Sequence, residues 1–441
     1  MYPDAGSRSA ALYERARAVL PDGVSRGTVL VNPYPISVAS GRGAWVTDVD
    51  GNRYLDANNN YTAIILGHAD PVVTEAVVGQ LGRGTAFSFA TEAEVALAEL
   101  LCERVGHFER IRFCNSGTEA VMAAVKAARA YTGRPLLAKF EGGYHGAYDH
   151  VEVSLDAGPD TWGDPSAPAS VPYAAGVPGS VAAETVVLPF NDADAVAALI
   201  DRHGDRLAAV LVDTLPSRIG MPAPDPAFLD ALWAAARRCG AVIIADEVIS
   251  FRLGPAGNLA RLGHRPDLTA LGKIIGGGFP VGAVAGRAEV MEVFASVDGR
   301  RPRLPAGGTF SANSVTMVAG RACLQQLDDA AFVRLAAMGE RVRAGVRAAF
   351  EELSMPGQVT GDGSLFRIHP HDRTVRSYRD ARHRGDEATF MARVHRDLLN
   401  GGVYLTTYGM GCLTLAMTDA DLDHLVAAIG AALRSARSVT A

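Results

Sequence analysis

A lysine between an apolar segment and a run of glycines is the first candidate for chemistry in this chain of 441 residues. Lys273 follows the mostly apolar segment 268–271 and comes shortly before three glycines at 276–278. Burial lowers the pKa of a lysine, because the charged form loses its hydration. A lysine in this setting is either a Schiff-base nucleophile or an ordinary solvated surface group. The glycines do not form a nucleotide-phosphate loop, because Ile274 stands where that motif has serine or threonine.

The segment 115–119, Asn-Ser-Gly-Thr-Glu, lies between a predicted strand and a predicted helix. Backbone N–H groups are free at the start of a helix, and the hydroxyls of Ser116 and Thr118 lie there on either side of Gly117. Together these donors suit an anion, in particular a phosphate. The alternative is that Ser116 or Thr118 only caps the helix.

Two more polar segments follow predicted strands. Residues 141–146, Glu-Gly-Gly-Tyr-His-Gly, offer the flat ring of Tyr144 for stacking, and their glycines let the backbone approach a ligand. His145 either assists the chemistry or is a hydrogen-bonded structural histidine. Asp246 follows the predicted strand 241–245, where its carboxylate either holds a protonated ring nitrogen or caps the next element. One opposite charge at contact distance changes a pKa by about 1–3, enough to keep a pyridine protonated at neutral pH.

A phosphate site, a stacking ring, a carboxylate and a lysine thus follow one another at successive strand ends, and this order points to pyridoxal 5′-phosphate. For these groups to meet, the strands must end at one edge of a sheet. The strands are continuous, mostly apolar runs and alternate with helices, which is typical of a doubly wound, mostly parallel sheet covered on both faces. The predicted strands are 111–114, 136–140, 208–212, 241–245, 268–271 and 281–285, with helices at 118–131 and 225–238.

A chain of 441 residues is long enough for a large core and a second lobe. We expect residues 66–312 to form the large α/β domain, and residues 1–65 and 313–441 to form a smaller α+β domain from both termini. The segment 45–55 predicts a hairpin, because its Asp-Gly pair favours a two-residue turn. Residues 154–181 are rich in Gly, Pro, Ala, Ser and Asp without periodicity, so they form either a mobile lid or an inert loop.

Composition limits the class of protein. Hydrophobic residues make up 48% of the chain and charged residues 20%, as in an ordinary soluble globular protein. The net charge of -6 gives no electrostatic case for a nucleic acid or an anionic membrane as partner. The five cysteines are scattered and odd in number, so they predict neither a metal site nor a disulfide framework. We therefore expect a cytoplasmic protein without a bound metal and without a membrane segment.

The motifs together resemble the class III, fold-type I pyridoxal-phosphate aminotransferases. The resemblance is closest to the branch that holds glutamate-1-semialdehyde aminomutase and bacterial β-phenylalanine aminotransferase. The similar stretches span nearly the whole chain and are 48–56, 66–68, 115–120, 140–146, 246–248, 271–278 and 308–310.

The resemblance implies a role for each motif. Lys273 would carry the cofactor as a Schiff base and Asp246 would hold the ring nitrogen, which makes these two the catalytic residues. Tyr144 would lie over the ring, with His145 also at the cofactor. Thr309 would reach the phosphate bound by the partner subunit, so the family implies a homodimer. The residues implied at the phosphate of the same subunit are Ser116, Gly117 and Thr118.

The chain departs from the family at two places that bear on the substrate. The family commonly has Glu-Pro-Val before a glycine turn, whereas residues 213–220 here are Asp-Thr-Leu-Pro-Ser-Arg-Ile-Gly. The β-phenylalanine branch has an arginine near a C-terminal position that is occupied here by Tyr408. In that branch an N-terminal arginine binds the substrate carboxylate, which makes Arg26 the first candidate for that role and Arg376 the second.

Three functions are compatible with these motifs. The first is an aminotransferase that moves an amino group between a β- or ω-amino acid and an oxo acid by a ping-pong mechanism. The second is a 2,1-aminomutase of the glutamate-1-semialdehyde type, in which one molecule is both donor and acceptor. The third is a catalytically idle scaffold, against which the presence of both Lys273 and Asp246 argues. The unusual run of asparagines at 58–60 argues against glutamate 1-semialdehyde itself as the substrate.

Overall fold

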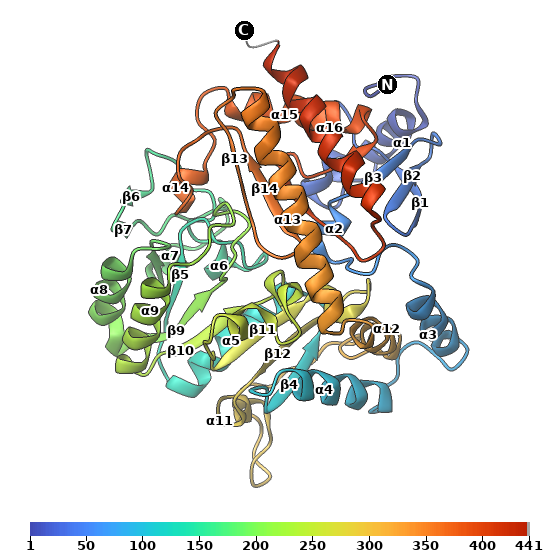
Figure 1. Cartoon of the computed structure of the whole chain (residues 1–441). Helices are drawn as coiled ribbons and strands as arrows, with labels where there is room; N and C mark the ends of the chain where they lie inside the picture. Colours follow the sequence, from blue (N-terminus) through green and yellow to red (C-terminus); the bar gives the residue numbers. More distant parts are fainter. Residues whose placement is uncertain (439–441) are drawn as a thin grey trace. The chain divides into compact units, whose positions relative to one another are not determined.

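The computed structural model describes residues 1–438 and divides the chain into two units (Figure 1). Unit 1 comprises residues 1–71, 334–372 and the chain from 383 onward, and unit 2 comprises 72–333 and 373–382. The division near the C-terminal third lies at 333 rather than at the expected 312, because helix α12 (Ser314–Gln325) packs inside unit 2. A Cβ atom on Gly320 of this helix would lie 2.0 Å from the backbone oxygen of Ile275, so glycine permits the close approach.

The sheet of unit 2 has seven strands in the order β4-β12-β11-β10-β9-β5-β8. Only β12 runs antiparallel to its neighbours, so the sheet is mostly parallel, as predicted. The edge strand β8 is the one that the sequence pattern missed. The strands are β4 (Arg110–Cys114), β5 (Leu136–Phe140), β8 (Thr185–Leu188), β9 (Leu207–Val212), β10 (Val242–Asp246), β11 (Leu268–Gly272) and β12 (Gly282–Gly286).

Helices cover both faces of this sheet, with α5 (Gly117–Thr132) on one face and α8 (Ala193–His203) and α9 (Pro226–Cys239) on the other (Figure 1). Successive side chains of a strand point to opposite faces. Leu136 accordingly packs with α8 and α9, whereas Leu137 packs with α5. Because both faces are covered, the inner strands β5, β9, β10 and β11 are buried at every position and mostly apolar, which is why their pattern predicted a covered parallel sheet.

The segment 154–181 contains a two-stranded hairpin and the short helix α7 (Gly179–Ala183). The Ser154 N–H donates to the carbonyl oxygen of Val171 at 2.7 Å. Arg379 donates to the carbonyl oxygen of Trp162 at 2.9 Å and pairs with Glu141. These bonds hold the segment within unit 2, and a lid-like motion of it stays a prediction.

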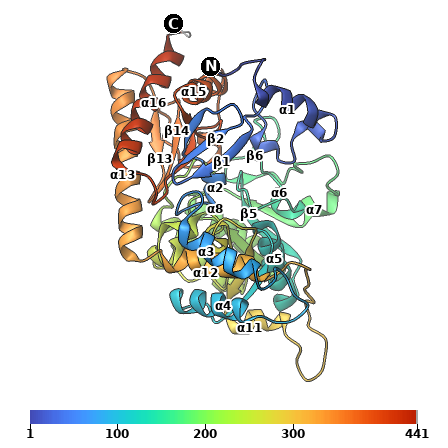
Figure 2. The same cartoon turned by 90° about the vertical axis from the view of Figure 1, so that its right-hand side faces the viewer.

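Unit 1 is built from both ends of the chain. Strand β3 (Arg53–Asp56) pairs in parallel with β15 (Val403–Tyr404), and β2 (Trp45–Asp48) forms the predicted hairpin with β3. Figure 2 shows helices α13 (Asp329–Glu352) and α16 (Asp419–Arg437) side by side in this unit, where a Cβ on Gly345 would lie 2.5 Å from Val426. The predicted small α+β domain from both termini is therefore confirmed. Among residues 1–438, no helix combines the length and the apolar character that crossing a membrane requires.

Candidate active site

Four neighbouring parallel strands of unit 2 end at the same edge of the sheet, and polar residues follow each of them. The order of the strands in the sheet is β11, β10, β9 and β5. Parallel strands present their carboxyl ends together, and ligands bind there in open α/β sheets. The structure thus brings together side chains that lie up to 132 positions apart in the sequence, namely those of Glu141, Tyr144, His145, Asp213, Asp246 and Lys273.

Asp246, the last residue of β10, has a carboxylate that two donors orient. His145 Nδ1 lies 2.7 Å from Oδ2, and the Val248 N–H donates to Oδ1 at 3.0 Å. Burial lowers the pKa of His145, although hydrogen bonding to Asp246 opposes this change. The histidine is therefore neutral at pH 7 and donates its Nδ1 proton to the carboxylate. A Cβ on Gly143 would lie 2.9 Å from His145 Nε2, so the second ring nitrogen faces the backbone, which supports an orienting role.

Lys273 follows β11 directly and adopts the left-handed backbone conformation, with φ of 51°. A non-glycine residue in that region is strained, and such strain is often found at functional sites. The side chain is partly exposed, and burial raises the pKa of the neighbouring Asp213 carboxyl, an effect that the positive charge of Lys273 opposes. The following glycines serve packing, since a Cβ on Gly277 would lie 2.3 Å from the Ala319 carbonyl oxygen of α12.

Residues 116–118 at the start of α5 form a cradle of N–H and hydroxyl groups, which lies against Gly146. Ser116 is the N-cap, and its Oγ accepts the N–H of Glu119 at 3.1 Å, so the capping interpretation is correct for this residue. The same hydroxyl still has a proton to donate, and the first N–H groups of the helix have no partner within it. Thr118 Oγ1 accepts the Ala147 N–H at 3.2 Å. A Cβ on Gly146 would lie 2.4 Å from Thr118 Oγ1, which requires glycine there.

Val248 fills the space between the cradle and the lysine, a packing role that sequence reasoning missed. A Cβ on Gly117 would lie 2.9 Å from Val248 Cγ1, and one on Gly272 would lie 3.3 Å from the same atom. Tyr144 has 49% of its surface exposed, so its ring is open to a ligand. Burial of the other half raises the pKa of its hydroxyl.

Two further buried acids lie at the site, and sequence reasoning assigned neither a role. Asp213 follows β9, and burial raises the pKa of its carboxyl well above the usual range, with the charge of Asp246 adding to the effect. Burial raises the pKa of Glu247 to about 7, and its Oε1 accepts the Leu259 N–H at 2.7 Å. The signal available in the sequence was an acid directly after a wholly apolar strand.

Lys139 is the second lysine near the site and lies fully buried on β5. Its Nζ donates to the Val153 carbonyl oxygen at 2.7 Å, and burial lowers its pKa to about 7. The chain has three lysines, and Lys126 on α5 is exposed. Lys273 is therefore the one of the three that combines access with a place at the strand edge.

The candidate substrate residues lie in both units. In unit 1 the Arg26 guanidinium donates to Asn60 Oδ1 at 2.7 Å, and both line a cavity of about 420 Å³. The four residues 59–62 all have positive φ, a left-handed turn that places Asn60 beside Arg26. The remaining lining is largely apolar or aromatic and includes Val29, Val31, Ile36, Val38, Val46, Tyr54, Tyr61, Leu399 and Tyr404.

Tyr408 and Arg376 have other partners. In unit 1 the guanidinium of Arg367 lies over the Tyr408 ring, 5.2 Å from its centre. In unit 2 Arg376 forms an ion pair with Asp225, the N-cap residue of α9. The Asp225 side chain makes no capping hydrogen bond with α9, because its carboxylate is engaged by this arginine.

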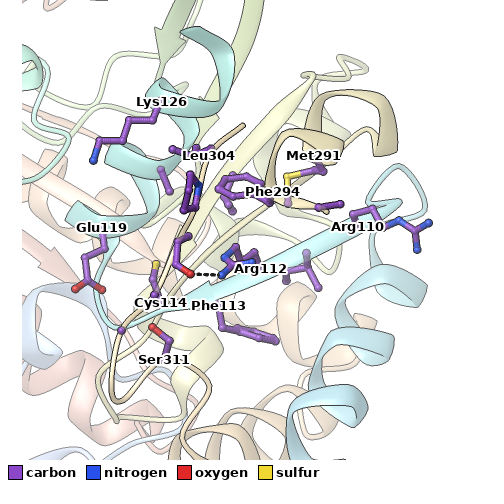
Figure 3. Close-up of a pocket in the computed structure, with 18 of the residues that line it drawn as sticks. Arg110, Arg112, Phe113, Cys114, Glu119, Lys126, Met291, Phe294, Leu304 and Ser311 are labelled. Carbon is purple, nitrogen blue, oxygen red and sulfur yellow. Dashed lines mark hydrogen bonds between the residues drawn. The ribbon is translucent and has the colours of Figure 1, made fainter. Parts of the chain in front are cut away.

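Thr309 lies in an exposed loop that borders a cavity of about 990 Å³ in unit 2 (Figure 3). Arg112 donates to the Ala306 carbonyl oxygen of this loop at 2.8 Å, and its guanidinium lies 5.5 Å from the centre of the Phe294 ring. A Cβ on Gly308 would lie 3.4 Å from Asn115 Nδ2, so the loop lies beside the start of the cradle of its own chain.

Comparison with known proteins identifies the family. The family model described as Aminotransferase class-III matches residues 28–433. The chain belongs to the class-III aminotransferases. It is 52% identical to an omega-transaminase from Sphaerobacter thermophilus, with a TM-score of 0.96 over 99% of both chains. It is 40% identical to the glutamate-1-semialdehyde 2,1-aminomutase of Methanothermobacter thermautotrophicus, covering 96% of this chain and 98% of the relative. It is also 37% identical to a beta-phenylalanine aminotransferase from Variovorax paradoxus, with a TM-score of 0.87 over 98% of this chain and 95% of the other.

This class-III aminotransferase is an enzyme of fold type I that uses pyridoxal 5′-phosphate. The residues present fit that cofactor. The α5 cradle offers N–H and hydroxyl donors for a phosphate, and Gly117 and Gly146 keep it free of side chains. Asp246 offers an oriented carboxylate for a ring nitrogen, and Lys273 offers an amine on the neighbouring strand.

Proposed function

We propose that the enzyme transfers an amino group from a β- or ω-amino acid that carries a carboxylate to an oxo acid, by a ping-pong mechanism. The observation that carries the proposal is the cavity of unit 1, in which Arg26 is set among mostly apolar and aromatic side chains. A guanidinium suits a carboxylate, and apolar walls suit an apolar substituent on the same substrate. The names of the omega-transaminase and the beta-phenylalanine aminotransferase support the same substrate class.

The roles of the residues follow from their chemistry. Pyridoxal phosphate, when bound, supplies an electron sink for the pair of electrons left on the substrate carbon. Lys273 Nζ would hold the cofactor through its aldehyde carbon, with loss of water; once the substrate amine has displaced it, the freed amine would move the proton from the substrate carbon that bears the amine to C4′. Asp246 holds a proton on the ring nitrogen, and His145 keeps that carboxylate in place. Tyr144 stacks on the ring, while Ser116, Gly117 and Thr118 hold the phosphate.

A half-reaction tests this proposal. The enzyme is loaded with pyridoxamine phosphate and offered a panel of oxo acids, and recovery of the pyridoxal-form absorbance reports amino-group transfer. The reverse half-reaction uses β- and ω-amino acids with the pyridoxal form. We expect transfer with apolar β- or ω-amino acids. An enzyme that transfers from none of them while accepting α-amino acids would contradict the proposed substrate class.

The second candidate is a 2,1-aminomutase, which the 40% identity to the Methanothermobacter enzyme favours. The two functions differ in whether an external acceptor is needed. Glutamate 1-semialdehyde given to the pyridoxamine form without any oxo acid would yield 5-aminolevulinate over many turnovers if the enzyme is an aminomutase. An aminotransferase would stop after about one turnover.

We also propose a homodimer in which Thr309 binds the phosphate held by the partner subunit. Several large apolar side chains of unit 2 are exposed and would be covered in a dimer. The loop that carries Thr309 is exposed too, although Gly308 in this loop also lies close to Asn115 of the same chain. The large apolar residues are Phe87, Phe89, Val95, Val297 and Phe310.

Mixed dimers separate action across the interface from action within one chain. Lys273→Ala chains are combined with Thr309→Ala chains through different affinity tags. If Thr309 acts across the interface, the mixed dimer has one intact site, with Lys273 from one chain and Thr309 from the other. We expect about half of the wild-type activity. A mixed dimer no more active than the Thr309→Ala homodimer would place Thr309 in its own site, and a fully active monomer would exclude the dimer.

We propose a cytoplasmic location as well. All five cysteines are free thiols, including the buried Cys323 and Cys412, and a reducing compartment preserves free thiols. Cell fractionation with an antibody to the protein tests this, and recovery of the protein from a periplasmic or membrane fraction would contradict it.

A further inference from the structure

We infer that Arg218 is a specificity-determining residue that binds a carboxylate of the substrate from the Tyr144 side of the site. This inference rests on the proposed function and deepens it, because it names a second anchor for an acidic substrate. Arg218 lies in the segment 213–220, where the chain departs from the Glu-Pro-Val pattern of the family. It comes after β9, the strand between β5 and β10 in the sheet.

The turn that carries Arg218 is closed by its own backbone. The Pro216 carbonyl oxygen accepts the N–H groups of Ile219 at 3.2 Å and of Met221 at 3.1 Å. Gly220, with φ of 103°, permits this path. Both Ile219 and Met221 are buried, whereas 38% of the Arg218 side chain is exposed. The fold therefore anchors the turn through its neighbours and leaves the guanidinium accessible at the strand edge.

A chain of contacts connects Arg218 to the segment that carries the stacking tyrosine. Arg218 lies 3.4 Å from Asp156 Oδ1, and the Tyr378 hydroxyl donates to the same oxygen at 3.1 Å. The Tyr378 ring packs on Gly142, where a Cβ would lie 2.1 Å from it. The positive charge of Arg218 also acts to lower the pKa of the Tyr144 hydroxyl, against the larger effect of burial. These contacts place the guanidinium close to the segment 141–146 that carries Tyr144.

The ion pair with Asp156 is weak enough to be exchanged for a substrate. Both side chains are more than one-third exposed, at 38% and 53%, and solvent screens such pairs strongly. A substrate carboxylate can take the place of Asp156, because the guanidinium offers five donors in a planar fork. Asp156 keeps its bond from Tyr378 when this happens, so the exchange leaves no buried charge unpaired.

The test compares two amines that differ only in a carboxylate. The donors are 3-amino-3-phenylpropanoate and 1-phenylethylamine, each measured by KM and kcat in the amino-donor half-reaction. We expect Arg218→Gln to raise KM for the carboxylate donor by tenfold or more, with little change for the other amine, and Arg218→Lys to be intermediate. Isothermal titration calorimetry with unreactive 3-phenylpropanoate provides a second readout and should show the same loss of affinity.

Two further variants separate binding from a structural role. Asp156→Asn keeps an acceptor for Tyr378 but removes the competing charge, so it should lower KM for the carboxylate donor. Arg238→Gln is the control, because Arg238 is an exposed arginine paired with Asp201 on the surface. Equal losses for both amines in Arg218→Gln, or unchanged binding of 3-phenylpropanoate, would overturn the inference. A wild-type enzyme that reacts with neither amine would instead contradict the proposed function.

Discussion

Replacing Lys139 by methionine should change how the stability of the protein depends on pH. Lys139 is fully buried, and burial lowers its pKa from 10.5 to about 7, with the charge of Arg218 adding to the effect and Glu141 and Glu152 opposing it. Below pH 7 the Lys139 amine is protonated in both the folded and the unfolded chain, so the folded state bears the full free-energy cost of a buried charge. Between about 7 and 10.5 the folded chain has released the proton while the unfolded chain still holds it, so stability rises with pH.

The size of the effect follows from proton linkage. Each pH unit in this window is worth up to about 1.4 kcal/mol for one proton. Between pH 7.5 and 9.5 the free energy of unfolding of wild type should therefore rise by about 2.5 kcal/mol relative to Lys139→Met. The variant also loses the bond to the Val153 carbonyl oxygen, a penalty of about 1–3 kcal/mol that is independent of pH.

Thermal unfolding of the cofactor-saturated proteins at the two pH values measures the difference, which should amount to about 3 degrees in Tm for a chain of this length. Lys126→Met is the matched control, because Lys126 is exposed on α5. Other titrating groups are common to all three proteins and cancel in the comparison. Equal pH dependence of wild type and Lys139→Met, or an equal change in Lys126→Met, would refute the argument from burial.

Three further predictions concern catalysis. Lys273→Ala should abolish turnover while cofactor still binds, and near wild-type turnover of this variant would contradict the assignment. Borohydride reduction of the wild-type enzyme should attach the cofactor to the peptide of Lys273 and not to those of Lys126 or Lys139. Asp246→Asn should still bind cofactor but react slower by a factor of 100 or more, which is on the order of the effect of removing one charge partner from a preorganised site. Stopped-flow rates within a few-fold of wild type would exclude Asp246 as the partner of the ring nitrogen. Arg26→Ala should raise KM for an acidic substrate about tenfold, equivalent to about 1.4 kcal/mol, and should spare an amine without a carboxylate; equal losses for both would make Arg26 structural.

Local patterns predicted the elements that position the site. β5, β9, β10 and β11 are buried at every position because helices cover both faces of the sheet, and this produces runs in the sequence that are apolar apart from Lys139, Asp246 and Thr269. The ends of helices could also be predicted from neighbouring residues. Helix α9, for example, begins at Pro226 and ends before Gly240, which has φ of 70°. The order of cofactor motifs could be predicted for the same reason, since each motif directly follows its own strand.

Contacts between distant segments could not be predicted from such patterns. Residues 373–382 join unit 2 although the chain around them belongs to unit 1, and Arg379 pairs there with Glu141, 238 positions away. Asp225 is the N-cap residue of α9, yet its side chain makes no capping hydrogen bond and pairs with Arg376 instead. Neither periodicity nor a turn motif indicates which charged residue from a distant segment will form an ion pair with a given side chain.

The sequence alone determined the fold class, the family and the candidate cofactor residues, because strand burial, helix caps and glycine turns are set by neighbours in the chain. Only the tertiary structure decided the environment of each polar group. It buried Lys139 completely, paired His145 with Asp246, and left the Arg218 guanidinium partly exposed. Solvation and electrostatic partners set the pKa and the reactivity of a side chain, and both depend on segments that come together only when the chain folds.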